Sequence, residues 1–301
     1  MKVNPFVYNA SRVTGEEWLA RARAGYSVAL LPLSQANLDG ADLAGLDLSD
    51  VMLNEISLRG ARLKGCRIVH ATFSDCHFDG ADLSGTEITR SVFTGCTFAG
   101  ARLSGARLRV SSLTGCDFAE AQLDGMEVGP ALLADCRLEG AVLRDARWQD
   151  VTCGGSSFGR AALDGIEMTS CTLSNATGKG LRAARALFRS TWLVGSTLEE
   201  SRFGECTFEQ AIISDSTLTG VSFRGSRFAE SRLADCTIEG GDFAATEQVG
   251  TSFSGSTLRG VDFAGARLAA MHFLEARLEN PTGFPEDLSG FNFNGATLTG
   301  V

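Results

Sequence analysis

The chain has 301 residues, with 27 lysines and arginines against 36 aspartates and glutamates, and its formal net charge is −9. This charge argues against direct binding of nucleic acid, because neutralising phosphates needs clustered Lys and Arg. No charge-free apolar run is long enough to span a membrane, and the N-terminus lacks the pattern of a secretory signal. We therefore expect a cytoplasmic protein that does not bind a membrane.

The first part of the chain has its own pattern. Residues Thr14–Glu17 fit a capping box, and the helical stretch from Trp18 to Ala24 stops at Gly25. We predict that residues 1–33 form an N-terminal helix and capping segment that shields the open end of the structure that follows. The alternative is that Trp18 binds a partner.

A five-residue period runs from Leu38 to Leu298. Of the 53 positions in this series, 41 are Leu or Phe. The period fits neither an α-helix nor a β-strand, and it predicts a solenoid whose short sides each contain five residues. Five positions of the series lack a large apolar side chain: Cys153, Gly178, Ala183, Gln248 and Gly283.

A second period of twenty residues sets the cross-section. Glycine recurs two residues after a core position, for example at Gly40, Gly60, Gly80 and Gly100, so four pentapeptides make one coil. Runs such as Ala41–Gly45 and Ala81–Gly85 resemble the A(D/N)LxG repeat of pentapeptide-repeat proteins. This resemblance implies an all-β solenoid, a right-handed four-sided parallel β-helix of about thirteen coils with a short N-terminal helical cap.

The β-helix is expected to continue to the last residue, with one interruption. Residues 34–280 form the regular repeats, and Pro281, Gly283 and Pro285 then interrupt a coil. We predict that residues 281–301 are an interrupted terminal coil of the same β-helix, through which the protein could form a homodimer.

Candidates for catalysis or metal binding are weak. Eight of the nine cysteines lie two residues before a core position and Cys153 lies in the core series, so all nine are predicted to be free, small core residues. The histidines, His70, His77 and His272, have no spacing that suggests a catalytic triad, and nothing resembles a metal-ligand quartet or a phosphate loop. We expect no enzymatic activity, no cofactor and no metal.

The outward positions of the predicted coils carry two charge patterns. One is a ladder of alternating sign that should hold neighbouring coils in register: Asp47, Arg67, Glu87, Arg107, Glu127, Arg147, Glu167, Arg227, Glu247, Arg267 and Asp287. The other is an acidic corner, which could imitate a phosphate backbone or simply provide solubility: Glu55, Asp75, Asp135, Asp215, Asp235 and Glu275.

A third outward pattern is apolar. Met52, Val92, Leu132, Trp192 and Ile212 stand where other coils have Thr or Ser, and no acid occurs between Met168 and Leu198. Tryptophan together with arginine is typical of binding hot spots. The predicted partner-binding residues are Lys179, Arg182, Arg185, Leu187, Arg189, Trp192, Val194 and Ile212. Alternatively, Gly178 and Ala183 mark a bulge or loop whose side chains fold back.

Two hypotheses for function follow. The first is a non-enzymatic protein-binding scaffold or adaptor. Its first coils, Leu38–Leu48, are similar to pentapeptide modules that accompany type VI secretion effectors in Gram-negative bacteria, so its partner would be such an effector or its carrier. The second is a DNA mimic of the quinolone-resistance type, which would bind the type II topoisomerases DNA gyrase or topoisomerase IV. The alternating ladder argues against mimicry, because a face of balanced charge is a poor copy of DNA.

Overall fold

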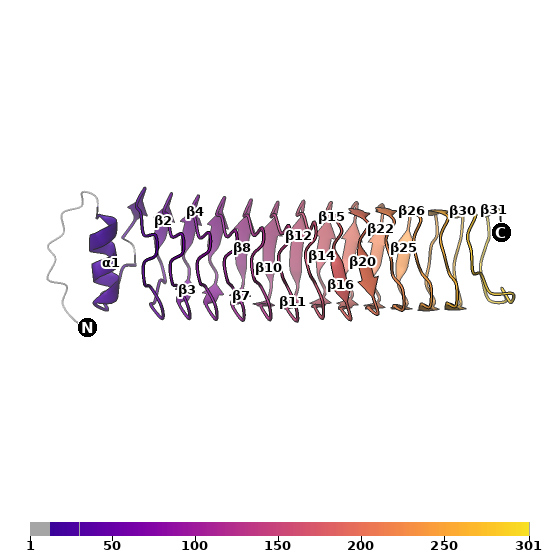
Figure 1. Ribbon diagram of the computed structural model, residues 1–301, viewed down its shortest axis with the longest axis horizontal. Coiled ribbons are helices and arrows are strands. Elements are labelled where there is room, and N and C mark those ends of the chain that lie inside the picture. The colour runs from indigo at the N-terminus through magenta and orange to yellow at the C-terminus, as the bar shows by residue number, and fades with distance from the viewer. Residues whose placement is uncertain (1–12, 30, 301) are drawn as a thin grey trace. The chain divides into compact units, whose positions relative to one another are not determined.

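The computed structural model describes residues 13–29 and 31–300, and the chain divides into two compact units, Met1–Ala141 and Val142–Val301. Within each unit the backbone winds in coils of parallel β-structure that stack one on the next (Figure 1). The chain is a β-solenoid of about thirteen such coils. The predicted solenoid of five-residue sides is confirmed.

Unit 1 begins with helix α1, Gly15–Arg23. The Glu17 amide donates to Thr14 Oγ1 at 3.2 Å, and the Thr14 amide donates to Glu17 Oε2 at 3.1 Å, which confirms the capping box. Trp18 is 0 % exposed, so the alternative in which Trp18 binds a partner is wrong. The helix lies against the first coil, because a Cβ on Gly15 would be 3.3 Å from Leu38 Cδ2. Residues 1–12 and 30 of the predicted capping segment lie outside the described residues.

The strands of unit 1 form two parallel sheets in register at a separation of twenty residues, so that Leu53 lies opposite Phe73. Sheet A contains β1 (Leu33–Ser34), β2 (Met52–Asn54), β4 (Thr72–Ser74), β6 (Val92–Thr94), β8 (Ser111–Thr114) and β10 (Ala131–Ala134). Sheet D contains β3 (Arg67–Val69), β5 (Glu87–Thr89), β7 (Arg107–Arg109) and β9 (Glu127–Val128). The other two sides of these coils pair through isolated bridges, such as Asp42 with Arg62.

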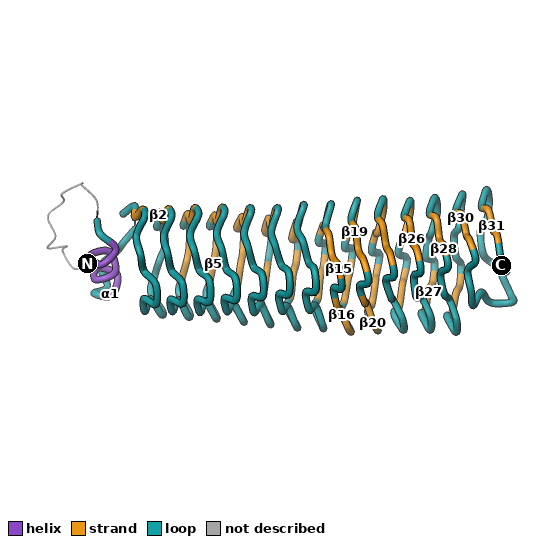
Figure 2. The backbone as a smooth tube through the Cα atoms, turned by 45° about the horizontal axis from the view of Figure 1, so that its top comes forward, coloured by secondary structure: helices purple, strands orange, loops and turns teal. Residues whose placement is uncertain are grey.

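Unit 2 has strands on all four sides, and Figure 2 shows the long third sheet, sheet B, in orange. Sheet A here contains β12 (Val151–Gly154), β14 (Thr172–Ser174), β18 (Trp192–Val194), β22 (Ile212–Ser214) and β25 (Arg232–Ala234). Sheet D contains β11 (Arg147–Gln149), β13 (Glu167–Thr169), β17 (Leu187–Arg189), β21 (Thr207–Glu209), β24 (Arg227–Ala229), β27 (Glu247–Val249) and β29 (Arg267–Ala269). Sheet B contains β15 (Thr177–Lys179), β19 (Thr197–Glu199), β23 (Thr217–Thr219), β26 (Thr237–Glu239), β28 (Thr257–Arg259), β30 (Arg277–Glu279) and β31 (Thr297–Thr299), and sheet C contains β16 (Arg182–Ala184) and β20 (Arg202–Gly204).

The core consists of like residues stacked along the solenoid. The Phe73 and Phe93 rings stack with centroids 4.6 Å apart in unit 1, as do those of Phe208 and Phe228 in unit 2. Offset aromatic stacking adds to the free energy gained by burying these rings. Because identical positions recur every twenty residues, the register that pairs the strands also aligns the core.

The coil that contains Gly178 and Ala183 is regular. These residues lie in β15 and β16, so the alternative of a bulge or loop is wrong. Leu181 occupies a slot that holds Ala in earlier coils, is 4 % exposed, and its Cδ1 would lie 3.6 Å from a Cβ on Gly178. Leu181 therefore fills part of the space beside Gly178, and an apolar cavity lined by Leu181, Phe188 and Leu198 remains in this part of the core.

The corners between sides use left-handed backbone, and many of these residues are not glycine. Asp75 has φ 49° and Glu120 has φ 58°. The Asp75 carboxylate leans over Gly95 of the next coil, where a Cβ would overlap it, and Glu120 Oε1 would lie 2.7 Å from a Cβ on Gly140. At these two corners, the glycine leaves room for the carboxylate of the previous coil.

All nine cysteines are free and buried, as predicted. The structure adds a hydrogen bond to this role: Cys66 Sγ donates to the Leu43 carbonyl at 3.0 Å, as Thr86 Oγ1 does to the Leu63 carbonyl at 3.0 Å. Burial raises the pKa of the Cys66 thiol to about 11. Cysteine thus replaces Ser or Thr as a donor that ties one coil to the previous one.

Candidate protein-binding surface

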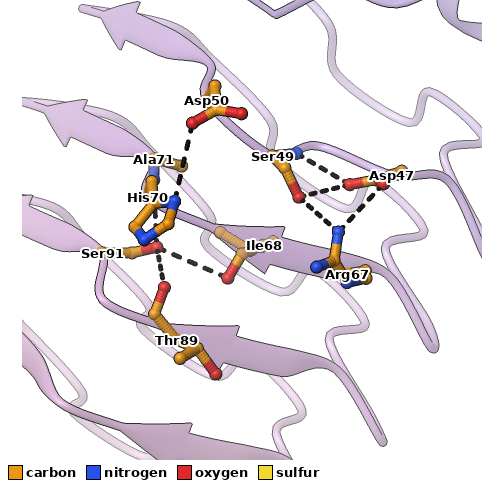
Figure 3. Close-up of polar contacts among 9 residues, drawn as sticks. All are labelled: Asp47, Ser49, Asp50, Arg67, Ile68, His70, Ala71, Thr89 and Ser91. Carbon is orange, nitrogen blue, oxygen red and sulfur yellow. Dashed lines mark hydrogen bonds and ion pairs between the residues drawn. The ribbon is translucent and has the colours of Figure 1, made fainter.

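The charges on sheet D of unit 1 are paired. Arg67 Nη1 lies 3.1 Å from Asp47 Oδ2, and Figure 3 shows Arg67 reaching both Asp47 and Ser49. Desolvation raises the pKa of Asp47, but hydrogen bonds from Ser49 and the charge of Arg67 outweigh it and lower the pKa. Arg107 approaches Glu127 Oε2 at 3.3 Å. The predicted alternating ladder is confirmed in this unit.

The ladder on sheet D of unit 2 has a gap. Arg147 lies 3.5 Å from Glu167, and Arg227 lies 4.0 Å from Glu247. Between these pairs, Leu187 and Thr207 take the outward positions. Most charges on this sheet are therefore balanced within the chain as well.

Sheet A of unit 1 presents a face without charge. The outward positions of β2, β4, β6, β8 and β10 are Met52, Thr72, Val92, Ser112, Leu132, Asn54, Ser74, Thr94, Thr114 and Ala134. Met52 is 54 % exposed, and Val92 and Leu132 are each 41 % exposed. In a chain of which 21 % is charged, five strands with no charged outward side chain form a distinct surface. We name these ten residues the uncharged face.

Sheet A of unit 2 carries a tighter apolar group. Trp192 is 50 % exposed and lies between Thr172 and Ile212 on the neighbouring strands. Val194 lies on the same strand as Trp192, and Ile212 is half-buried. We name Trp192, Val194 and Ile212 the Trp192 cluster. Of the predicted partner-binding residues, only Val194 and Ile212 lie on the same sheet as Trp192 in the part of the chain that the structure describes.

The other predicted partner-binding residues lie on different sides of the coil. Lys179 is on sheet B and forms ion pairs with Glu199 at 3.2 Å and Glu200 at 3.3 Å. Arg182 is on sheet C, and Arg185 is at a corner with φ 53°. Leu187 and Arg189 are on sheet D, and Arg189 Nε lies 2.8 Å from Glu209 Oε2. Leu187 and Trp192 therefore lie on different sheets, because each side of a coil uses only five residues.

The acidic corner borders sheet A in both units. In unit 1 it contains Glu55, Asp75 and Asp135, with Gly95 and Gly115 between the last two. Gln35 Nε2 donates to Glu55 Oε2 at 3.1 Å. In unit 2 the corner residues are Asp215, Asp235 and Glu275. Because glycines interrupt it, the corner gives an acidic edge beside sheet A and no continuous acidic strip.

The described residues show little that could support catalysis. His70 Nδ1 lies 3.7 Å from Asp50, and His77 Nδ1 contacts Thr97 Oγ1 at 3.2 Å. Within residues 13–29 and 31–300, no three His, Cys, Asp or Glu side chains cluster to hold a metal ion. The same described ranges contain no helix of the length and hydropathy needed to cross a membrane.

A family comparison matches the repeats directly. The model for pentapeptide repeats matches eight copies, over residues 56–95, 91–125, 193–229 and 201–240. The chain is a pentapeptide-repeat protein. No curated protein sequence matches it significantly.

Solved structures similar to this pentapeptide-repeat protein include HetL, a pentapeptide-repeat protein involved in heterocyst differentiation regulation in the cyanobacterium Nostoc. It is 20 % identical, covers 95 % of this chain and 94 % of its own, and has a TM-score of 0.32. QnrB1, a plasmid-mediated fluoroquinolone resistance protein, is 23 % identical over 72 % of this chain and 90 % of its own, with a TM-score of 0.29. The catalytic domain of a GH87 α-1,3-glucanase is 9 % identical over 97 % and 70 %, with a TM-score of 0.39. At these identities and TM-scores, the similarities say nothing about the function of this chain.

The sequence contained a signal for the uncharged face that the prediction used only in part. Reading every twentieth residue from Met52 and from Asn54 gives no Asp, Glu, Lys or Arg as far as Ile212 and Ser214. The apolar residues alone suggested a patch, whereas the absence of charge along these two columns includes both the uncharged face and the Trp192 cluster.

Proposed function

We propose that this pentapeptide-repeat protein is a non-enzymatic scaffold that binds another protein through sheet A. The observation that carries the proposal is the uncharged face, where Met52 is 54 % exposed in a chain that pairs its charges on sheet D. In unit 2, the Trp192 cluster is the corresponding surface. Each unit offers its own contact surface in this proposal.

The physical support comes from the composition of binding interfaces. Charged residues are depleted in the centre of an interface, and Trp and Met are enriched there. A polar rim surrounds such a centre, and the acidic corner beside sheet A supplies one along one edge. A tryptophan contributes strongly to binding when its neighbours exclude water from the contact. Val194 and Ile212 lie beside Trp192 and are placed to do this.

Two finer proposals concern the partner. The first is a type VI secretion effector or its carrier, and the alternative is DNA gyrase or topoisomerase IV. The paired charges of sheet D and the interrupted acidic corner favour the first, because a DNA mimic needs a run of unpaired anions. The free, buried cysteines suit a reducing compartment, so we place the scaffold in the cytoplasm.

The test is affinity capture by the full-length chain from a lysate of its native host, followed by mass spectrometry. Trp192→Thr and Val92→Glu remove the two proposed contact surfaces, and Val249→Thr is the matched control. Val249 is 45 % exposed but lies on β27 of sheet D. We expect proteins that the wild type and the control capture but that one of the two sheet A variants loses.

The identity of the lost proteins separates the finer proposals. Secretion components support the first partner, and topoisomerase subunits support the second. If both sheet A variants retain every protein that the wild type captures, sheet A is not the binding surface and the proposal fails. Circular dichroism of each variant must match that of the wild type, since Trp192 and Val92 are outward residues whose loss leaves the core filled.

A further inference from the structure

Sheet C and the bridges that extend it in unit 2 carry an ordered charge pattern. Five outward residues follow one another on adjacent coils, each paired with the next in register: Arg182, Arg202, Ser222, Asp242 and Asp262. Two bases occupy one end, two acids occupy the other, and a serine separates them. We name these five residues the split column.

The split column departs from the rule that the rest of the solenoid follows. Like charges on directly opposed strand positions destabilise a sheet, and the same column in unit 1 alternates as Asp42, Arg62, Asp82 and Arg102. Among the outward strand positions of the described residues, Arg182 with Arg202 and Asp242 with Asp262 are the only like-charged neighbours. The fold does not require this arrangement, because unit 1 forms the same coils without it.

The charges of the split column lack partners of opposite sign. Arg182 and Arg202 are exposed, and no ion pair joins either to another described residue. The Asp242 carboxylate accepts a hydrogen bond from Ser222 Oγ at 2.9 Å, and that of Asp262 accepts one from Thr282 Oγ1 at 2.9 Å. These neutral donors hold the two carboxylates in place and leave their charge uncompensated.

When the order of the split column is reversed, each arginine stands opposite an aspartate. We propose that a second copy of this chain docks antiparallel on this face. The two-fold axis lies between the two copies, parallel to the strands of this face, and passes over Ser222. Arg182 then faces Asp262 of the partner subunit, and Arg202 faces Asp242 of the partner subunit. Because the interface is isologous, each pair occurs twice. This proposal does not depend on the proposed scaffold function.

The surrounding surface permits a close approach. On this side of the coil, the outward position two residues after each split-column residue holds a small residue in four of the five coils: Ala184, Gly204, Ala244 and Ala264. The split column spans about 19 Å at the usual strand spacing, which is short for a stable protein interface. We therefore expect a weak dimer whose affinity depends strongly on salt, since exposed ion pairs are screened.

A charge-swap experiment tests the proposal by sedimentation velocity on the full-length chain. The variant Arg182→Asp/Arg202→Asp makes the split column wholly acidic, and Asp242→Arg/Asp262→Arg makes it wholly basic. Each variant alone should dimerise at least about tenfold more weakly than the wild type, and an equimolar mixture should form a heterodimer. The wild-type dimer should weaken at least about tenfold between about 50 and about 500 mM NaCl.

Controls keep the result specific. Arg227→Glu/Arg267→Glu changes the net charge by the same amount on sheet D of the same unit, and it should leave the dimer unchanged. If a charge-swap variant does not fold, the neutral Arg182→Ser/Arg202→Ser should still weaken the dimer. A monomeric wild type, a mixture that does not associate, or a dimer that survives both variants overturns the proposal.

One competing arrangement has a distinct signature. Leu288 and Leu298 of the predicted terminal coil are each 38 % exposed, so a dimer could instead form there. Loss of the dimer in Leu298→Asp, together with its retention in both charge-swap variants, would assign it to the terminal coil and overturn the split-column dimer.

The two-fold axis itself can be located. Among the residues two positions after the split column, only Arg224 is large, whereas the other four are Ala or Gly. Arg224 would face Arg224 of the partner subunit at the axis. Arg224→Ser should therefore tighten the dimer severalfold, because it removes a repulsion between like charges. A weaker dimer in Arg224→Ser would contradict this position of the axis.

Discussion

Sheets A and D of unit 1 are made by the same coils and have nearly opposite surfaces. Their strands are alike in length and both bury a Leu, Ile, Val or Phe at the central position. Sheet D exposes paired acids and bases, whereas sheet A exposes no charge at all. The backbone and the core are the same on both sides, so they cannot account for the difference. The outward side chains differ between the two sheets and are therefore free to serve binding, while the inward side chains serve stability.

The largest effect is expected where the two sheets are alike, in the core. Phe93 is 1 % exposed and stacks on Phe73 at 4.6 Å. Phe93→Ala should lower the free energy of unfolding by about 3–5 kcal/mol, because it leaves a cavity between coils that cannot collapse. Urea unfolding followed by circular dichroism measures this. A loss below about 1 kcal/mol would mean that the coils relax around the cavity.

A second prediction concerns the interior behind sheet D. The folded state holds the pKa of the Cys66 thiol at about 11, above that of an exposed thiol, so the unfolded state ionises first as the pH rises. The protonated Cys66 thiol therefore contributes fully to the free energy of unfolding below about pH 9. This contribution is lost between about pH 9 and 11, and the free energy of unfolding should have fallen by about 2 kcal/mol at pH 10.5. Cys66→Ala, which matches Ala106 at the same inward position of a later coil, should lose less stability over this range than the wild type in unfolding experiments. Parallel loss in the two proteins would show that Cys66 ionises normally.

A third prediction inverts one rung of the ladder. Glu87 lies between Arg67 and Arg107 in register, so Glu87→Arg places three positive charges in a row. The cost should be about 1 kcal/mol at low salt and should shrink as salt screens the charges. The neutral Glu87→Gln should cost less. Equal midpoints of thermal unfolding for all three proteins at low salt would show that the ladder does not hold the register.

The smallest change in stability is expected on the uncharged face. Thr72→Glu places a charge between Met52 and Val92, and it should change the free energy of unfolding by less than about 0.5 kcal/mol because the side chain remains in solvent. Capture of the partner should nevertheless fall, since a buried unpaired carboxylate opposes binding. Unchanged capture would limit the binding surface to unit 2.

The periodicity of the sequence was sufficient to predict the coil, the core series and the ladder. Each depends on residues that repeat at a fixed spacing, and the Leu or Phe at every fifth position fixes which residues point inward. The helix α1 was also predictable, because Thr14 and Glu17 form a local motif. These features follow from short-range or strictly periodic signals.

Other features needed coordinates because they depend on neighbours twenty residues away or on the turn of the chain. Trp18 was open to two interpretations until the structure showed it fully buried. Leu181 gives no sign in the sequence that it fills the space beside Gly178. The predicted partner-binding residues from Lys179 to Val194 looked contiguous, yet they go around one coil. Because each side contains five residues, residues five or more apart along one coil lie on different sides of this fold.

The corners between sides have a consequence for evolution. Where the Asp75 carboxylate leans over Gly95, and where that of Glu120 leans over Gly140, a side chain at the glycine would occupy the same space. A side chain introduced at either glycine would thus require the acid one coil away to take another position. Among descendants of a common ancestor, substitutions at these corners should be correlated at a separation of twenty residues, and coils should be gained, lost or exchanged in compatible neighbouring pairs.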